Sequence, residues 1–289
     1  MTHLLCFGLG YSAQVLGRQL AAQGWRITGT ARSRAGVREL AGRGFDALAF
    51  DGLAPSPEVR EAAMQATHVL VSVPPDAGGD PVLRHHGRDL EASRSICWIG
   101  YLSTVGVYGD HGGAWVDETT PATPASPRSR WRLAAEDAWR ALGSRSGKRV
   151  QIFRLPGIYG PGRSAIDRLR EGSAQRIVKP GQVFNRIHVD DIAGALAAAI
   201  AGRGAHAIYN VTDDEPSPPQ DVIAYAAELL GVPPPPEVAF AAARLTDMAK
   251  SFYAENKRVA NVRLRSELGV QLKFPSYREG LRAIMTQLR

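Results

Sequence analysis

The chain has 289 residues, of which 35 are Lys or Arg and 28 are Asp or Glu, so its formal net charge is +7. The composition is that of a soluble globular protein, and the length is enough to bury a core in one large or two small domains. No apolar run approaches the ~20 residues of a membrane span, and the arginines are scattered without interleaved aromatics, which argues against nucleic-acid binding. The positive charge suits a small anionic ligand.

The chain opens with a short apolar run that ends in a Gly-x-Gly-x-x-Ala turn, and a helical pattern follows directly. This strand–turn–helix context is the one required of a dinucleotide-binding fingerprint. Gly8 would permit the tight turn, Gly10 would let the backbone approach a pyrophosphate, and Ala13 would stand at the helix–strand contact. The amides that open the helix, at Tyr11 and Ser12, would hold the phosphates. The alternative is an ordinary glycine turn of an α/β protein.

A second strand is predicted over residues 25–30, and the turn after it bears on cofactor choice. In these folds an acidic residue at this turn pairs with the ribose 2′-hydroxyl of NAD, whereas arginine accommodates the 2′-phosphate of NADP. Here the turn contains Arg32, Ser33 and Arg34 and no acid. The guanidinium groups can make charge-assisted bonds to a phosphate. The sequence therefore predicts NADP over NAD, with a pair of solvated loop arginines as the alternative.

Strand and helix patterns alternate through the first half of the chain. Further strands are predicted at 45–50, 68–73, 96–102 and 150–154, and helices at 37–41, 57–66, 83–93 and 130–142. This alternation predicts a parallel sheet with helices on both faces, whose ligands bind at the carboxyl ends of the strands.

The pattern is less regular after the strand at 150–154. A loop at 156–162, a helix at 192–201, a strand at 207–211 and a helix at 220–230 are predicted, followed by a basic and mostly helical end.

The cysteines and histidines give no sign of a metal site or a disulfide. Cys6 and Cys97 lie in apolar runs typical of buried strands, so both are predicted to be buried free thiols. His85 and His86 lie in a polar stretch, where a solvated helix face or loop is expected. The N-terminal run lacks a basic leader and is broken by glycines, so it is interpreted as a strand rather than a signal peptide, and the protein is expected to be cytoplasmic.

Several segments resemble, in order along the chain, the extended short-chain dehydrogenase/reductase family in its branch of sugar-nucleotide epimerases and dehydratases. Besides the opening fingerprint, the matching segments are 102–109, 116–121, 154–162, 186–193 and 209–211. The resemblance implies a doubly wound α/β Rossmann sheet followed by a smaller C-terminal α/β domain that covers the substrate. It divides the chain into an NADP-binding domain at 1–155, to which 183–211 return, and a substrate-binding part at 156–182 and 212–289.

The resemblance also implies a Ser or Thr, a Tyr and a Lys at the active site. Thr104 matches the Ser/Thr position, where it would bind the reacting oxygen. The Tyr and Lys positions are occupied by Arg128 and Arg132, with Leu133 and Glu136 fixing the register. A guanidinium cannot exchange its proton near neutral pH, so Arg128 could stabilise an oxyanion but could not act as an acid or base. Arg132 could still hold ribose hydroxyls, and for both arginines the alternative is a solvated helix face.

The remaining family positions divide into cofactor contacts and structural residues. The resemblance places Asp51 near the adenine and lets Ser72 and Pro74 line the cofactor groove. Tyr101, Tyr108 and Tyr159 are expected to pack in the interior, while His188 and Asp191 are interpreted as mainly structural. An arginine that often meets the diphosphate of nucleotide sugars is replaced here by Phe184, with Arg186 two residues further along.

Together these features predict an NADP-dependent oxidoreductase or epimerase/dehydratase-like enzyme for a small hydroxyl or carbonyl substrate. The alternative is an NADP-binding sensor or scaffold that has lost catalysis, as the missing tyrosine suggests. No nucleic-acid or membrane partner is expected, and a homodimer is left open. The substrate and the direction of the reaction are not determined at this level.

Overall fold

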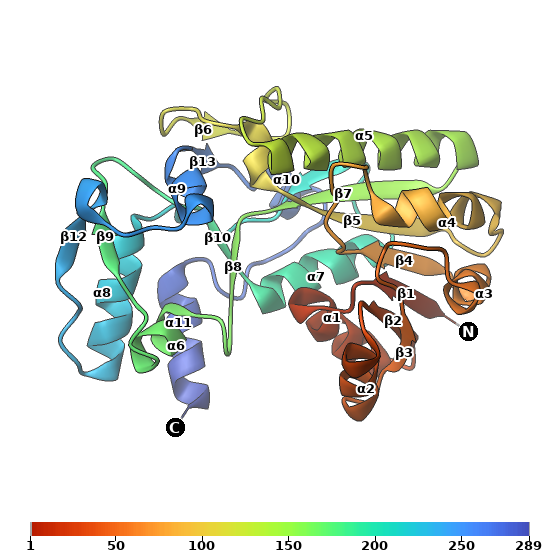
Figure 1. The fold of residues 1–289 in the computed structure, drawn as a ribbon, viewed down its shortest axis with the longest axis horizontal. Helices are drawn as coiled ribbons and strands as arrows, with labels where there is room; N and C mark the ends of the chain where they lie inside the picture. The colour runs from red at the N-terminus through yellow and green to blue at the C-terminus, as the bar shows by residue number, and fades with distance from the viewer. Residues whose placement is uncertain (1, 289) are drawn as a thin grey trace.

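The computed structural model describes residues 2–288, and a seven-stranded sheet dominates it (Figure 1). The strand order is β11-β7-β5-β4-β1-β2-β3, and every neighbouring pair is parallel. The strands are β1 (His3–Phe7), β2 (Arg26–Ala31), β3 (Asp46–Ala49), β4 (His68–Val71), β5 (Trp98–Thr104), β7 (Arg149–Leu155) and β11 (Ile208–Asn210). Among residues 2–288, none of the helices combines the length and the apolar character that crossing a membrane needs.

Helices cover both faces of this sheet, which explains why its central strands are continuous apolar runs rather than alternating ones. One face is covered by α1 (Tyr11–Ala21), α2 (Arg34–Gly42) and α7 (Val189–Ile200), and the other by α3 (Pro57–Gln65), α4 (Pro81–Ala92) and α5 (Pro127–Ser146) (Figure 1). Every residue of β1 and β4 is buried. The doubly wound sheet predicted from the alternation is therefore confirmed.

The helix starts follow local sequence rules. Ser56 and Ser126 accept hydrogen bonds from the amides three residues later, and a proline follows each of them at the first helical position. Asp80 caps α4 in the same way, accepting from the amides of Val82 and Leu83. These caps extend α4 and α5 beyond the ranges that apolar periodicity predicted.

A smaller group of helices lies beside the carboxyl ends of the strands. It comprises α6 (Ala165–Arg170), α8 (Pro219–Leu230) and α11 (Tyr277–Gln287), which share an apolar core of their own (Figure 1). Three two-stranded pairs join distant parts of the chain: β8 (Gly157–Tyr159) with β10 (Arg186–His188), β9 (Arg176–Val178) with β12 (Glu237–Ala239), and β6 (Trp115–Val116) with β13 (Arg258–Val259). The remaining elements of the fold are short: η1 (Val105–Tyr108), η2 (Phe240–Ala242), α9 (Asp247–Tyr253) and α10 (Val262–Ser266).

Some local predictions were wrong. Cys97 is exposed, because it lies just before β5 begins and the helices do not cover it. His86 is fully buried, with its Nδ1 3.0 Å from Asp89 Oδ2 and its ring against Phe50. The predicted loop at 156–162 contains β8, which needs the distant β10 as its pairing partner.

Candidate functional site

The glycine turn after β1 has the geometry of a phosphate-binding loop. Gly8 has φ +81°, a backbone region that favours glycine. Gly10 is the N-cap of α1, no side chain caps the helix, and its first turn holds no acidic residue. A Cβ built on Gly10 would meet nothing within 4 Å, so the backbone is open to a ligand here. The free amides and the open approach fit the pyrophosphate of a nicotinamide dinucleotide.

Hydrogen bonds from the neighbouring strands hold this turn in place. The amide of Gly8 donates to Thr30 Oγ1 at 2.9 Å, and the hydroxyl of Ser72 donates to the carbonyl of Gly8. Ser12 and Ala13 are buried on α1, with Ala13 in the core against the sheet. Ser72 therefore supports the turn from the end of β4.

Tyr11 lies at the same helix start, but its side chain contacts the segment at 161–163. Its hydroxyl donates to the carbonyl of Pro161 at 3.0 Å, and the guanidinium of Arg163 lies 5.8 Å from its ring centre. Burial raises the pKa of Tyr11 to about 12, with the charge of Arg163 acting in the opposite direction. A phenol with this pKa stays protonated at neutral pH and can donate its hydrogen bond. Tyr11 therefore links the glycine turn to the 157–163 segment.

The residues predicted to select the cofactor follow β2, which pairs with β1, and Asp51, predicted near the adenine, follows the edge strand β3. Arg32 and Arg34 are exposed, and within residues 2–288 no carboxylate lies within salt-bridge distance of either one. Ser33 caps α2 by accepting from the amide of Gly36 at 3.2 Å. Asp51 is exposed and accepts from the amide of Leu53 at 2.9 Å. Both arginines are therefore exposed to solvent and, among residues 2–288, have no ion-pair partner.

Four predicted site residues line one cavity of about 530 Å³: Pro74, Thr104, Arg128 and Arg132. Thr104 ends β5 and caps η1, its Oγ1 accepting from the amide of Gly106 at 3.1 Å. Arg132 donates from Nη1 to the carbonyl of Leu102 at 2.8 Å and to the hydroxyl of Tyr101 at 3.1 Å. Arg128 is exposed at the mouth of the cavity. The structure thus brings Thr104 together with Arg128 and Arg132, which follow it 24 and 28 residues later along the chain. The two arginines are four residues apart and lie on one face of α5.

A second cavity of about 670 Å³ adjoins the first, and Thr104, Gly106, Phe252 and Glu255 line both. Glu255 was missed at the sequence level. Its carboxylate lies 2.6 Å from Nζ of Lys257, which is itself 6% exposed and donates to the carbonyl of Gly109. A buried ion pair is thus set into the wall of the cavity beside Thr104.

The segment that carries Glu255 is fixed by backbone bonds to both sides of the cleft. The amide of Asn256 donates to Asp110 Oδ1 at 2.7 Å, and its carbonyl accepts from the amide of Gly113 at 3.0 Å. Asn185 Nδ2 donates to the carbonyl of Lys257 at 3.0 Å. These contacts join segments 72 to 146 residues apart, so no local motif could have pointed to Glu255.

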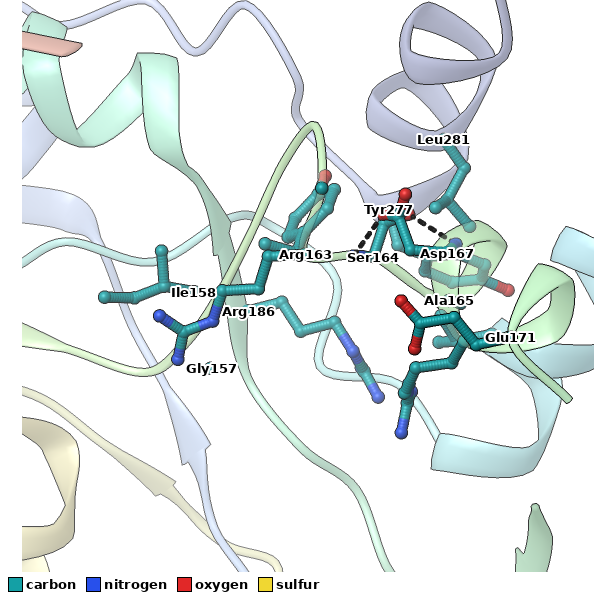
Figure 2. A pocket seen from close by; sticks show the side chains of 14 residues that line it. Gly157, Ile158, Arg163, Ser164, Ala165, Asp167, Glu171, Arg186, Tyr277 and Leu281 are labelled. Carbon is teal, nitrogen blue, oxygen red and sulfur yellow. Dashed lines mark hydrogen bonds between the residues drawn. The ribbon is translucent and has the colours of Figure 1, made fainter. Parts of the chain in front are cut away.

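Three arginines also line the second cavity: Arg163, Arg168 and Arg186. They also line a third cavity of about 420 Å³, in which Figure 2 shows Arg163 and Arg186 near the Ser164–Asp167 capping box. Arg186 Nη1 donates to the carbonyls of Phe184 at 2.9 Å and Ser217 at 3.1 Å. The sequence singled out Arg186 but gave no reason to group it with the other two.

The tyrosines expected to be structural are buried and hydrogen-bonded. Tyr108 donates to Asn210 Oδ1 at 2.8 Å, and Tyr159 donates to the carbonyl of Ser276 at 3.2 Å. Burial raises the pKa of both, as it does for Tyr101. All three phenols are therefore held in their protonated form inside the protein.

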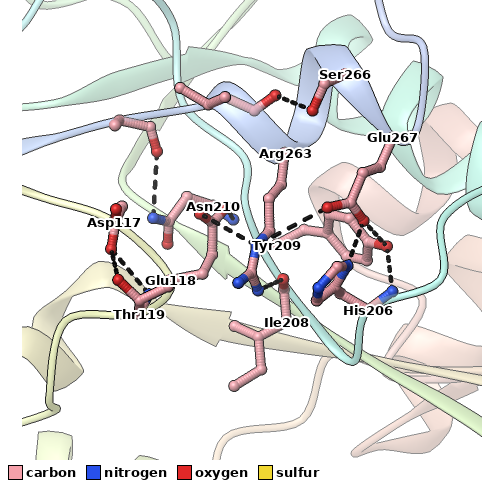
Figure 3. Close-up of polar contacts among 12 residues, drawn as sticks. Asp117, Glu118, Thr119, His206, Ile208, Tyr209, Asn210, Arg263, Ser266 and Glu267 are labelled. Atoms are coloured by element: carbon pink, nitrogen blue, oxygen red, sulfur yellow. Dashed lines mark hydrogen bonds and ion pairs between the residues drawn. The ribbon is translucent and has the colours of Figure 1, made fainter.

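Two other family segments, at 116–121 and 186–193, make structural contacts near the edge of the sheet. Figure 3 shows the 117–119 turn beside β11, where Glu118 Oε1 accepts from the amide of Asn210 at 2.8 Å. His188 caps α7, and Asp191 accepts from the backbone amides of Lys273 and Phe274 at 2.7 and 3.1 Å. These contacts agree with a structural role for His188 and Asp191.

Comparisons with known proteins bear on this arrangement. The model of the NAD dependent epimerase/dehydratase family matches residues 91–212. Protein YeeZ of Escherichia coli (strain K12) is 30% identical over 289 residues, which cover 95% of this chain and 97% of YeeZ. A 3-diazoavenalumate denitrifying reductase of Streptomyces sp is 31% identical over 180 residues, covering 57% of this chain and 58% of that protein.

A solved structure also matches over the full length. It is a functionally unknown conserved protein from Silicibacter pomeroyi DSS, with a TM-score of 0.90 and 52% sequence identity, covering 100% of this chain and 99% of that one. The similarity therefore includes the C-terminal segment that carries Glu255 and Lys257.

Proposed function

Because this chain belongs to the NAD-dependent epimerase/dehydratase family, we propose that it is an NADP-dependent oxidoreductase or epimerase-like enzyme for a small hydroxyl or carbonyl substrate. The observation that carries this proposal is the position of Thr104. Its side chain lies at the carboxyl end of β5, in a cavity that also contains Pro74 from the end of β4 and Glu255. In a doubly wound sheet this edge is where cofactor and substrate meet.

The glycine turn and the arginines after β2 would hold the cofactor. The turn at Gly8 and Gly10 would bind the pyrophosphate, and Arg32 and Arg34 would bind the 2′-phosphate of NADP. A bound nicotinamide would supply the acceptor or donor of a hydride. Arg132 occupies the family's lysine position, and its guanidinium, anchored on Tyr101, would contact the nicotinamide ribose.

The proton of the reaction needs a group other than the missing tyrosine. Arg128 cannot exchange a proton near neutral pH, so its contribution would be electrostatic. Glu255 is the carboxylate that lines both cavities with Thr104. We assign it as the acid–base: it takes the hydroxyl proton when the substrate is oxidised to a carbonyl and returns that proton on reduction. Thr104 would hold the reacting oxygen, and Lys257 would hold the carboxylate in position.

The open cleft favours an enzyme over a sensor that has lost catalysis. A sensor would be expected to have its substrate pocket filled by side chains, whereas here a cavity of about 670 Å³ reaches Thr104. A cytoplasmic location is part of the proposal, because NADP(H) is available there and the exposed thiol of Cys97 suits a reducing compartment. A homodimer stays open as the assembly.

The test is a titration of the purified protein with NADPH and with NADH. Losing one charge-assisted contact in Arg32→Ala should weaken NADPH binding by about 10- to 100-fold and leave NADH binding unchanged. The matched control is Arg38→Ala, which removes an exposed arginine from the next turn of α2. Equal weakening of both cofactors by Arg32→Ala would overturn the preference for NADP, and no binding of either cofactor would overturn the proposed function.

A further inference from the structure

The larger cavity holds an excess of positive charge that the protein does not neutralise. Four cationic side chains line it, Arg163, Arg168, Arg186 and Lys257, against the single carboxylate of Glu255. Glu255 and Lys257 pair with each other at 2.6 Å. Within residues 2–288, none of the three arginines has a carboxylate within 4 Å, so their charges face the cavity without an ion-pair partner.

Holding the charges of Arg168 and Arg186 in the protein carries a desolvation cost. Arg168 reaches solvent through the cavity, yet enough protein surrounds its guanidinium that burial lowers its pKa. Burial also lowers the pKa of Arg186, where the charge of Asp213 acts in the opposite direction and that of Arg168 adds to the lowering. Arginine cannot discharge by losing its proton in a protein. An unpaired cluster of this kind is therefore suited to an anion that arrives from outside.

The nearby carboxylates are poorly placed to provide this compensation. Asp213 is buried, and burial raises its pKa well above the usual range although the charge of Arg186 acts in the opposite direction. Its Oδ2 has no hydrogen-bond partner among the described residues. Asp167 already accepts from the amide and the hydroxyl of Ser164, and Glu171 is exposed at the rim of the smaller cavity.

Part of the lining of the larger cavity is apolar. This part includes Ile177, Ile223, Leu245, Phe252 and Tyr253. Phe184 stands where the family's diphosphate-binding arginine is expected, and its ring packs edge-on against Tyr253, with 5.1 Å between centres. The cavity therefore combines cationic side chains, apolar walls, the hydroxyl of Thr104 and the carboxylate of Glu255.

We propose that the substrate of this enzyme is an amphipathic hydroxy or oxo compound with a compact anionic group, a phosphate or a dicarboxylate, that binds Arg168 and Arg186. Its apolar body lies against the apolar walls of the cavity and its reacting oxygen meets Thr104 and Glu255. This inference rests on the proposed function, because it names the substrate class of the same site. It differs from a nucleotide-sugar substrate in placing an apolar wall beside the anion.

The experiment measures binding of two probes to the full-length protein by calorimetry at constant ionic strength. Phenyl phosphate and benzylmalonate each join a compact dianion to an apolar ring, and inorganic phosphate shows the contribution of the anion alone. We expect saturable binding of phenyl phosphate or benzylmalonate, tighter than that of inorganic phosphate. The tighter of the two ring-bearing probes identifies the chemistry of the anionic group.

Two variants separate specific binding from general charge attraction. Arg168→Gln should weaken binding of the tighter probe by about 10-fold or more, because it removes one charge-assisted contact. Arg170→Gln, an exposed arginine on the same helix, should leave binding unchanged. Arg186→Gln should weaken probe binding as Arg168→Gln does. Arg186 also bonds two backbone carbonyls, so its variant could fold poorly, and in that case the test depends on Arg168→Gln.

The result stays separable from the cofactor proposal when NADPH is titrated into the same samples. Protein that binds NADPH but neither ring-bearing probe would overturn the inference about the substrate while leaving the cofactor assignment in place. Equal weakening by Arg168→Gln and Arg170→Gln would also overturn it. Probe binding that depends on Arg168, in protein that does not bind NADPH, would support the anion site and overturn the cofactor.

Discussion

Two regions of the molecule contain an arginine that packs within the protein, the buried Arg154 and the half-buried Arg186, and their surroundings differ. Under the carboxyl edge of the sheet, Arg154 donates from Nη2 to Glu136 Oε2 at 2.7 Å, and both side chains are 5% exposed or less. Burial lowers the pKa of Arg154, but the hydrogen bonds and charge of Glu136 outweigh this and leave it raised. In the cleft, Arg186 has carbonyl partners but no carboxylate within 4 Å among residues 2–288, and its pKa is lowered.

The difference shows how a charge can serve structure in one place and binding in another. Ser103 also donates to Glu136, so the Arg154–Glu136 pair forms a closed network that links β5, α5 and β7. The guanidinium of Arg186 is held on one side and left open toward a cavity. A closed network has nothing left to bind a ligand, whereas an open one gains stability when an anion binds.

The largest effect should come from breaking the closed network. Glu136→Gln leaves the buried guanidinium of Arg154 without its counter-charge, and we expect the free energy of unfolding to fall by about 3–5 kcal/mol. Urea unfolding measures this. Asp137→Asn, which removes an exposed partner of Arg140 on the same helix, is the control and should change stability by less than ~1 kcal/mol. An equally small effect of Glu136→Gln would mean that the network is not structural.

The next effect concerns chemistry at the cleft. Glu255→Gln should lower the rate of hydride transfer by about 100-fold or more, because an amide cannot accept the substrate's proton. NADPH binding should be retained, which shows that the fold and the cofactor groove are intact. The rate is followed by NADPH absorbance with a substrate from a screen of anionic hydroxy and oxo compounds. Full activity in Glu255→Gln, compared with the exposed-residue control Glu228→Gln, would exclude Glu255 as the acid–base.

A buried histidine sharpens the comparison, because unlike arginine it can lose its charge. Burial lowers the pKa of His188 to about 4, with Asp190 raising it and Lys273 lowering it. Between pH 6.5 and about 4 the unfolded chain binds a proton on this imidazole that the folded chain does not. Stability from His188 is therefore present above pH 6.5 and should be lost by roughly 2–3 kcal/mol as the pH falls toward 4.

The variant His188→Asn isolates this contribution, since asparagine can still cap α7. The measurement is the free energy of unfolding as a function of pH. We expect the wild-type protein to lose more stability than His188→Asn between pH 6.5 and 4. Parallel curves for the two proteins would show that His188 titrates normally in the folded state.

The smallest expected change in stability concerns the unpaired arginines of the cleft, Arg168 and Arg186. Arg168→Gln removes a like charge near Arg186, so stability should stay the same or rise by about 0.5 kcal/mol. Arg170→Gln serves again as the control, and thermal unfolding without added anions is the measurement. A marked loss of stability in Arg168→Gln would indicate that Arg168 is structural, as Arg154 is.

Much of the fold was predictable because neighbouring residues determine where its strands and helices begin and end. The apolar run that ends at Gly8 and the Pro-led start of α3 depend on residues within one turn of each other. Such signals survive without knowledge of the tertiary fold. The prediction for Cys97 was wrong because periodicity places the start of a strand only to within a few residues, and that margin decides whether a side chain is covered.

The sequence by itself determined the doubly wound sheet, the glycine turn at Gly8 and Gly10, and the absence of a tyrosine beside Arg128. Only the tertiary structure brought Glu255 to Thr104 and grouped Arg168 with Arg186. The physical reason is that a turn or a helix start is set by neighbouring residues, whereas a cleft is built where distant segments pack. The charge and shape of that cleft are properties of the packing and have no counterpart in any single stretch of the chain.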